Sequence, residues 1–160
     1  MSQRANVLAD RIEQGAAALA AFAEGLSDAQ WRAVVPGDGR AVGVTIHHVA
    51  SVYPIEIELA RTLASGKPIV GVTWGGVADM NAKHARDHGA ATKAETLELL
   101  RRNSKVAADA VRGFSDAELD RAAPCSLNAD APLTAQFIVE DHALRHSFHH
   151  LVRIRAALKG

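Results

Sequence analysis

The hexapeptide Gly25-Leu-Ser-Asp-Ala-Gln30 recurs almost unchanged in the second half of the chain as Gly113-Phe-Ser-Asp-Ala-Glu118. In both copies the serine is followed three residues later by Gln or Glu, which is the pattern of a capping box at the start of a helical turn. Each copy follows an alanine-rich helical segment and precedes a proline, a polar loop and a long segment that carries histidines. The repeat therefore predicts two similar helical hairpins.

Four long segments of the chain have the periodicity of amphipathic helices, and glycines, capping boxes or a Gly-Lys-Pro stretch mark their ends. They cover residues 2–24, 40–65, 92–112 and 132–158, and a shorter helical piece at 77–88 precedes the third. Two hairpins that face each other make a four-helix bundle, and the long link between the second and third long helices permits a crossover. We predict an all-α protein with one domain over residues 1–160.

The composition agrees with packed helices and argues against other classes of protein. Apolar residues make up 48% of the chain but aromatic residues only 4%, which suits close helix packing better than a sheet. Lys and Arg balance Asp and Glu at 18 each, so no basic surface favours nucleic-acid binding. The single Cys125 fits a reducing compartment. With no signal peptide and no apolar run near the roughly 18 residues of a membrane span, we expect a soluble, cytoplasmic protein.

Eight histidines are the unusual feature of the composition. On the second long helix, His48 lies within about 60° of apolar side chains such as Val44 and Val52, so we expect it to face the core. His47 shares its side of the helix with polar residues such as Ser51, and we expect it to be solvated.

On the fourth long helix, His150 flanks an apolar arc that includes Phe137 and Phe148, and His146 lies about 40° further round. His142 and His149 lie toward the polar side. An i, i+4 pair such as His146 and His150 rises only about 6 Å along the helix and can chelate one ion. His48, His146 and His150 are therefore the candidate metal ligands.

Other interpretations of these histidines remain open. A lone inward histidine is often a hydrogen-bonded core residue, and an i, i+4 pair on an exposed face is usually incidental. Three inward imidazoles from two helices favour a metal site, because burying them without a partner is costly. His84 and His88 form another i, i+4 pair on the short helical piece, and we interpret them as solvated or pocket-lining.

The order of these motifs resembles the DinB-like superfamily of four-helix-bundle proteins. The segments that carry the resemblance are Arg40-Ala-Val-Gly-Val-Thr-Ile-His-His48 and His146-x-x-x-His150-Leu-Val-Arg-Ile-Arg155, and the likeness extends over essentially the whole chain. The resemblance implies an up-down-down-up bundle and frequent homodimers. It also implies a site for a divalent ion such as zinc or nickel, with His48, His146 and His150 as the ligands. His47, His142 and His149 lie near the expected ligands. A ligand assignment that differs by one residue therefore remains open.

Three imidazole ligands leave at least one coordination position open, as in catalytic metal sites. The first hypothesis is therefore an enzyme, a transferase or hydrolase, in which the ion activates water or a low-molecular-weight thiol against a small electrophilic substrate. No general base is evident, although Glu56, Asn81 and His84 could line a pocket. The second hypothesis is a non-catalytic metal-binding or stress-related bundle. The third is an ordinary bundle whose histidines have structural roles only.

Overall fold

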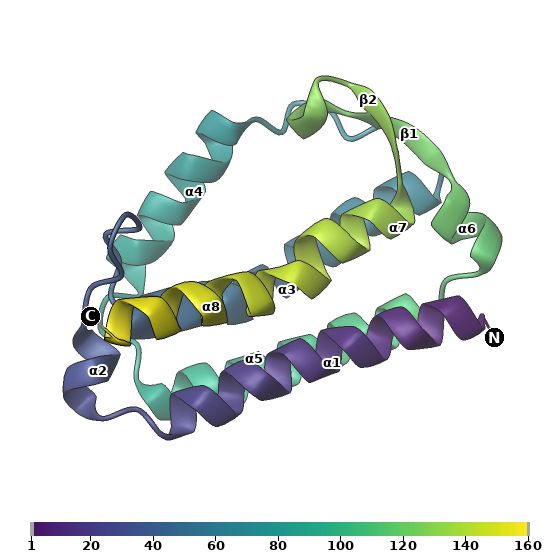
Figure 1. Cartoon of the computed structure of the whole chain (residues 1–160). Helices are drawn as coiled ribbons and strands as arrows, with labels where there is room; N and C mark the ends of the chain where they lie inside the picture. Colours follow the sequence, from purple (N-terminus) through teal and green to yellow (C-terminus); the bar gives the residue numbers. More distant parts are fainter. Residues whose placement is uncertain (1, 160) are drawn as a thin grey trace.

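The computed structural model describes residues 2–159, and four long helices dominate it (Figure 1). They are α1 (Gln3–Glu24), α3 (Val42–Ala64), α5 (Lys93–Arg112) and a last helix composed of α7 (Ala135–Ile138), a π-helical stretch (Val139–Leu144) and α8 (Arg145–Lys159). The helices α1 and α8 run in one direction and α3 and α5 in the other, while α4 (Trp74–Asp87) provides the crossover between α3 and α5. The predicted all-α, up-down-down-up four-helix bundle is confirmed.

The predicted capping boxes are present at three helix starts. Ser27 and Ser115 each accept a hydrogen bond from the backbone N–H three residues on, and each box opens a short helix, α2 (Asp28–Arg32) or α6 (Asp116–Asp120). The same box at Thr92 opens α5. Each box satisfies backbone N–H groups that the first helical turn leaves free. The repeated hexapeptide thus builds the same turn after α1 and after α5.

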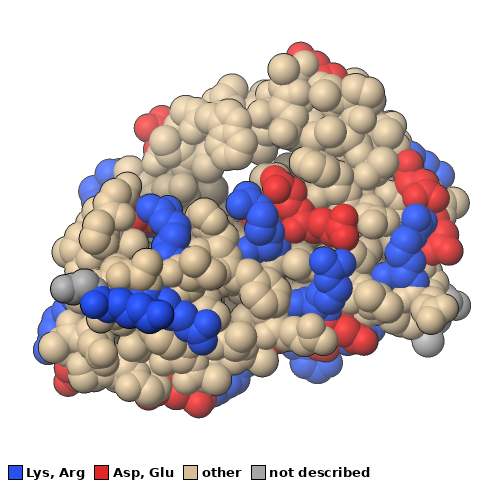
Figure 2. Space-filling model, viewed as in Figure 1, with Lys and Arg blue, Asp and Glu red and all other residues tan. Residues whose placement is uncertain are grey.

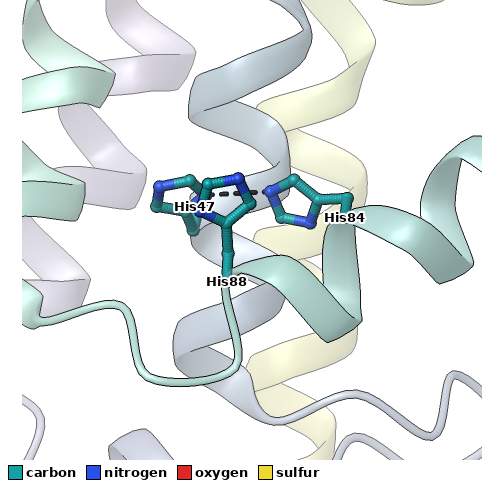
Figure 3. Close-up of side chains that lie close together, drawn as sticks. All are labelled: His47, His84 and His88. Carbon is teal, nitrogen blue, oxygen red and sulfur yellow. Dashed lines mark hydrogen bonds between the residues drawn. The ribbon is translucent and has the colours of Figure 1, made fainter.

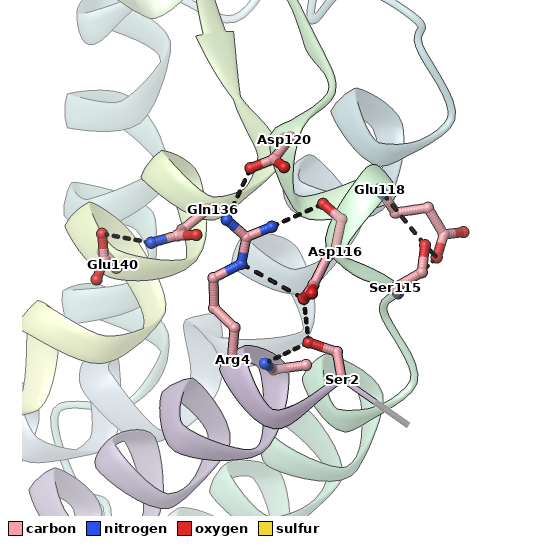
Figure 4. A network of polar contacts seen from close by, with 9 residues as sticks. Ser2, Arg4, Ser115, Asp116, Glu118, Asp120, Gln136 and Glu140 are labelled. Carbon is pink, nitrogen blue, oxygen red and sulfur yellow. Dashed lines mark hydrogen bonds and ion pairs between the residues drawn. The ribbon is translucent and has the colours of Figure 1, made fainter.

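The second copy of this turn also holds the beginning of α1 (Figure 4). Arg4 donates hydrogen bonds to the Asp120 carboxylate and to the Asp116 carbonyl oxygen, each at 2.8 Å. Ser2 caps α1 by accepting from the Ala5 N–H at 3.0 Å, and its hydroxyl donates to the Asp116 carboxylate. Exposed ion pairs contribute only about 0–1 kcal/mol each. Their role here is to fix where α6 lies against α1.

The fourth long helix begins later than its periodicity predicts. Residues 131–134 belong to a small antiparallel hairpin of β1 (Ala122–Cys125) and β2 (Ala131–Thr134). The helix starts after Thr134, whose side chain accepts from the Phe137 N–H. Before α4, Ile69 makes a single parallel bridge to Cys125 without forming a strand.

A π-helical stretch over Val139–Leu144 interrupts the α-helical hydrogen bonding of the last helix. Val139, Ala143 and Leu144 are buried within it. Phe137 and Phe148, predicted on the apolar arc, are 38% and 40% exposed, so the prediction is wrong for these two side chains.

Pro54 lies inside α3 without ending it. Proline has no N–H, so the carbonyl of Ala50, one turn earlier, loses its helical partner. The side-chain amide of Asn103 on α5 donates to this Ala50 oxygen at 2.8 Å. The proline therefore creates a specific link between α3 and α5.

Within residues 2–159, no helix combines the length and the apolar character that a membrane span needs.

Candidate metal centre

Three of the histidines meet where α3 packs against α8. His48 comes from α3, and His146 and His150 come from successive turns of α8. One nitrogen from each ring can be chosen so that all three lie within 4.8 Å of one another. The ring centroid of His48 lies 5.0 Å from that of His146 and 5.7 Å from that of His150. The structure thus brings together the three residues that the sequence selects.

A buried hydrogen bond sets the two helices in register beside this group. Tyr53 Oη of α3 and Ser147 Oγ of α8 lie 2.7 Å apart, and both side chains are almost fully buried. Burial raises the pKa of Tyr53, so its hydroxyl stays neutral and available for this bond. The bond lies one turn from His48 on α3 and directly after His146 on α8. It therefore fixes the relative position of the ligands.

Burial also keeps two of the imidazoles neutral. His48 and His150 are each only 5% exposed. Loss of hydration, with smaller contributions from neighbouring cationic groups, lowers the pKa of His48 to about 2 and that of His150 to about 3. Neutral imidazole is the form that binds metal ions. At neutral pH the site therefore offers ligands that need not lose a proton first.

The third histidine has a carboxylate partner. His146 Nδ1 lies 2.7 Å from Glu56 Oε1, and Glu56 is buried on α3. With the proton on Nδ1, the imidazole donates to the carboxylate and its Nε2 is free to bind an ion. This carboxylate–histidine arrangement commonly orients metal-binding histidines. The sequence indicated Glu56 only as a pocket residue, since the contact depends on how α3 meets α8.

A divalent ion fits this group of side chains. Among the described residues, His150 Nδ1 and Glu56 Oε2 are buried without a hydrogen-bond partner, so the protein alone leaves polar atoms at the site unsatisfied. Three imidazoles backed by a carboxylate are a donor set suited to ions such as zinc or nickel. His48, His146 and His150 would hold such an ion.

The three histidines open onto a cavity of about 550 Å³ between α3, α4 and α8. Figure 2 shows the surface hollowed below the arch formed by α4 and the hairpin, with basic and acidic side chains next to one another near the opening. One wall is apolar, and Arg40, Arg145 and Arg153 also line the cavity. Arg40 Nη1 is buried without a partner. The cavity therefore suits a small molecule with an apolar part and a negatively charged group.

The other histidines differ in part from expectation. His47, predicted to be solvated, is only 8% exposed, so that prediction is wrong. The helix α4 covers it: His84 Nε2 lies 2.8 Å from His47 Nδ1, and the His88 ring stacks on His47 with centroids 4.3 Å apart. A helical wheel of the second long helix contains no information about α4, and so could not have found this.

The remaining two histidines line the same cavity as the candidate ligands. His142 is half-buried, and His149 is exposed with its ring centroid 5.1 Å from that of His150. Neither belongs to a group of three close metal-binding side chains among residues 2–159. The geometry therefore favours His146 and His150 over these neighbours as ligands.

Comparison with known proteins identifies the family and supports the fold. A family model described as the DinB superfamily matches residues 11–154. The solved structure of YfiT from Bacillus subtilis superposes with a TM-score of 0.76 at 16% identity, over 99% of this chain and 89% of that one. YfiT is described as a probable metal-dependent hydrolase with an unusual four-helix bundle topology. The comparison with curated proteins finds no significant match.

Proposed function

The chain belongs to the DinB superfamily, and on that premise we propose that it is a metal-dependent hydrolase of a small molecule. The divalent ion, zinc or nickel, is held by His48, His146 and His150. The observation that carries the proposal is the convergence of these three imidazoles, two of them deeply buried, at the wall of a cavity of about 550 Å³. The description of YfiT as a probable metal-dependent hydrolase supports the reaction class.

Each part of the site has a separate task in this proposal. A bound divalent ion supplies Lewis acidity, which lowers the pKa of water or of a thiol and so provides a nucleophile at neutral pH. Glu56 orients His146 through its Nδ1 proton. The arginines of the cavity attract a negatively charged group of the substrate, and the apolar wall excludes water from the rest of it.

The substrate class follows from the cavity lining. Arg40 presents a buried Nη1 without a partner, and Arg145 and Arg153 line the same cavity. Arg145 and Arg153 are already paired with Asp141 and Asp38. The donor that a carboxylate or phosphate group next to the cleaved bond would satisfy is therefore Arg40 Nη1. We therefore propose small anionic esters or amides as substrates. A low-molecular-weight thiol as co-substrate, and hence group transfer instead of hydrolysis, is the alternative to water as the nucleophile.

The test combines metal analysis with a substrate panel. Purified protein is loaded with zinc or nickel, and its metal content is compared with that of His150→Ala and of His149→Ala, a matched control one residue away. We expect His150→Ala to lose the ion and the hydrolysis of anionic esters, while His149→Ala keeps the ion. If turnover requires an added thiol, the reaction is group transfer to the thiol and not hydrolysis.

Two results would contradict the proposal. If His150→Ala binds as much metal as the wild type, His150 is not a ligand and the proposed site is wrong. Bound metal without turnover of any ester, amide or thiol pair would favour the non-catalytic metal-binding bundle.

The proposal includes a cytoplasmic homodimer, as the sequence and the family resemblance lead us to expect, and light scattering of the purified protein tests the dimer.

A further inference from the structure

A second group of three histidines lies where α4 meets α3 (Figure 3). It consists of His47 on α3, His84 on α4 and His88 at the C-terminal cap of α4. As in the first group, one nitrogen from each ring can be chosen so that all lie within 4.8 Å of one another. Adjacent residues of a helix point about 100° apart. His47 and His48 can therefore serve two different groups from neighbouring positions on one helix.

The side chains of this group do not satisfy one another fully. His47 Nδ1 and His84 Nε2 lie 2.8 Å apart, and Ser51 Oγ lies 3.2 Å and 3.4 Å from these two nitrogens. The Ser51 hydroxyl donates to the His47 carbonyl, so toward the rings its oxygen can only accept. His84 Nδ1 is buried and has no partner among the described residues. An unpaired buried nitrogen is costly, but this one is not the nitrogen that faces His47, so a water beside the group would satisfy it.

The group opens onto a cavity of its own. This cavity has a volume of about 540 Å³, and His47 and His88 line it together with Asp87, Glu95 and Glu98. Arg102 lines this cavity too, so acidic side chains outnumber basic ones three to one here, whereas arginines outnumber carboxylates three to two in the first cavity. Carboxylates around the entrance favour the approach of a cation. The two cavities therefore differ in the charge of the species that they attract.

The helix α4 has few points of attachment. No residue of α4 is buried, although Val77 is partly buried and packs against the core. At its N-terminal end the Trp74 indole N–H donates to the Leu127 carbonyl at 2.9 Å, and near its C-terminal end His84 contacts His47. Between these points α4 supplies Val77, Met80 and Asn81 to the wall of the first cavity. An interaction that joins His84 to His47 therefore also holds in place the α4 residues that line the first cavity.

We propose that His47, His84 and His88 form a second site for a divalent transition-metal ion, which fastens α4 to α3. Imidazole nitrogen suits zinc, nickel and copper ions. At a tetrahedral zinc ion with Zn–N bonds of about 2.0–2.1 Å, two ligand nitrogens lie about 3.3 Å apart. The closest pair must therefore separate by about half an ångström, which a helix without buried residues permits.

Cobalt(II) titration of the metal-free protein, followed by visible absorbance and by the metal retained after gel filtration, tests the second site. We expect two ions per wild-type chain and one in the double variant His84→Ala, His88→Ala. His149→Ala is the matched control and keeps two. Because α4 buries no residue, the double variant keeps the bundle core, and circular dichroism verifies that. The same number of bound ions in the wild type and in the double variant would overturn the proposal.

Hydrogen exchange of residues 74–87 supplies an independent readout of the same site. Addition of the second equivalent of zinc slows exchange across α4 in the wild type and leaves it unchanged in the double variant. Exchange that is unaffected by zinc in the wild type would overturn the fastening role. The variant His48→Ala, His150→Ala separates the two proposals. If zinc still slows exchange across α4 in this variant, the second site stands whether or not the first site binds an ion.

Discussion

At the scale of single residues, the contact between Glu56 and His146 explains how the less buried ligand is held. His146 lies furthest from the apolar arc of its helix, and the sequence alone supports it least. The structure provides the reason for its orientation in a buried carboxylate 2.7 Å from Nδ1. Glu56 is only 6% exposed, and its other carboxylate oxygen has no partner among the described residues.

The substitution Glu56→Gln tests this contact. Gln can still accept from His146 Nδ1, but without charge, so we expect zinc affinity to fall by about 10–100-fold, the usual effect of altering a residue that supports a metal ligand. Competition with a chromophoric chelator measures the affinity. Glu58→Gln, an exposed residue of the same helix, is the control. Equal affinity of Glu56→Gln and wild type would show that the carboxylate does not support the ligand.

The ion pair between Asp38 and Arg40 predicts a pH dependence of stability. Asp38 accepts from Arg40 at 2.9 Å, its side chain is 5% exposed, and the hydrogen bonds from Arg40 lower the pKa of Asp38 in the folded state. A lowered carboxyl pKa stabilises the fold above the unfolded value of about 3.9, and this stabilisation is lost as the pH falls below it.

We therefore expect Asp38→Asn to lower the free energy of unfolding by about 1–3 kcal/mol at pH 7, the range for a hydrogen bond to a charged group. The difference from wild type should shrink toward pH 3, where Asp38 of the unfolded chain is already protonated. Urea unfolding at several pH values measures it. A difference that stays constant from pH 7 to pH 3 would mean that the carboxylate charge is not the cause.

At the scale of elements, the sequence predicts the helices well and their irregularities poorly. The capping boxes and helical periodicity locate α1, α3 and α5 to within about two residues, because caps and apolar spacing are local properties. The π-helical stretch and the hairpin before α7 result from packing against other elements, which no local pattern contains. For the same reason, the burial of His48 could be predicted from the apolar face of its own helix. The burial of His47 could not, because α4 covers it.

Close packing of α2 on α3 depends on a glycine. A Cβ added at Gly43 would lie 2.3 Å from the Trp31 indole, which in turn donates to the Ala91 carbonyl at 3.3 Å. We expect Gly43→Ala to destabilise the protein by about 1–3 kcal/mol through overpacking. Gly75→Ala on α4, whose nearest neighbour would be 3.9 Å away, is the control and should be close to neutral. Thermal unfolding compares them, and equal midpoints for the two variants would contradict this account.

At the scale of the whole molecule, the bundle forms two groups of histidines around α3. The adjacent residues His47 and His48 belong to different groups. The fold and the first group could be predicted because the family motifs and the helical faces agreed on the same three residues. The cavity, the role of Glu56 and the second group could not, because they depend on how α4 lies across α3 and α8. Both candidate sites share α3 as their common support.

Anomalous diffraction from crystals grown with zinc tests the central claim most directly. Data collected on both sides of the zinc absorption edge should show a peak bonded to one nitrogen each of His48, His146 and His150, at about 2.0–2.1 Å. A further peak at the second group is expected but is not needed for this claim. A map without zinc among His48, His146 and His150 would contradict it, even if zinc were bound elsewhere.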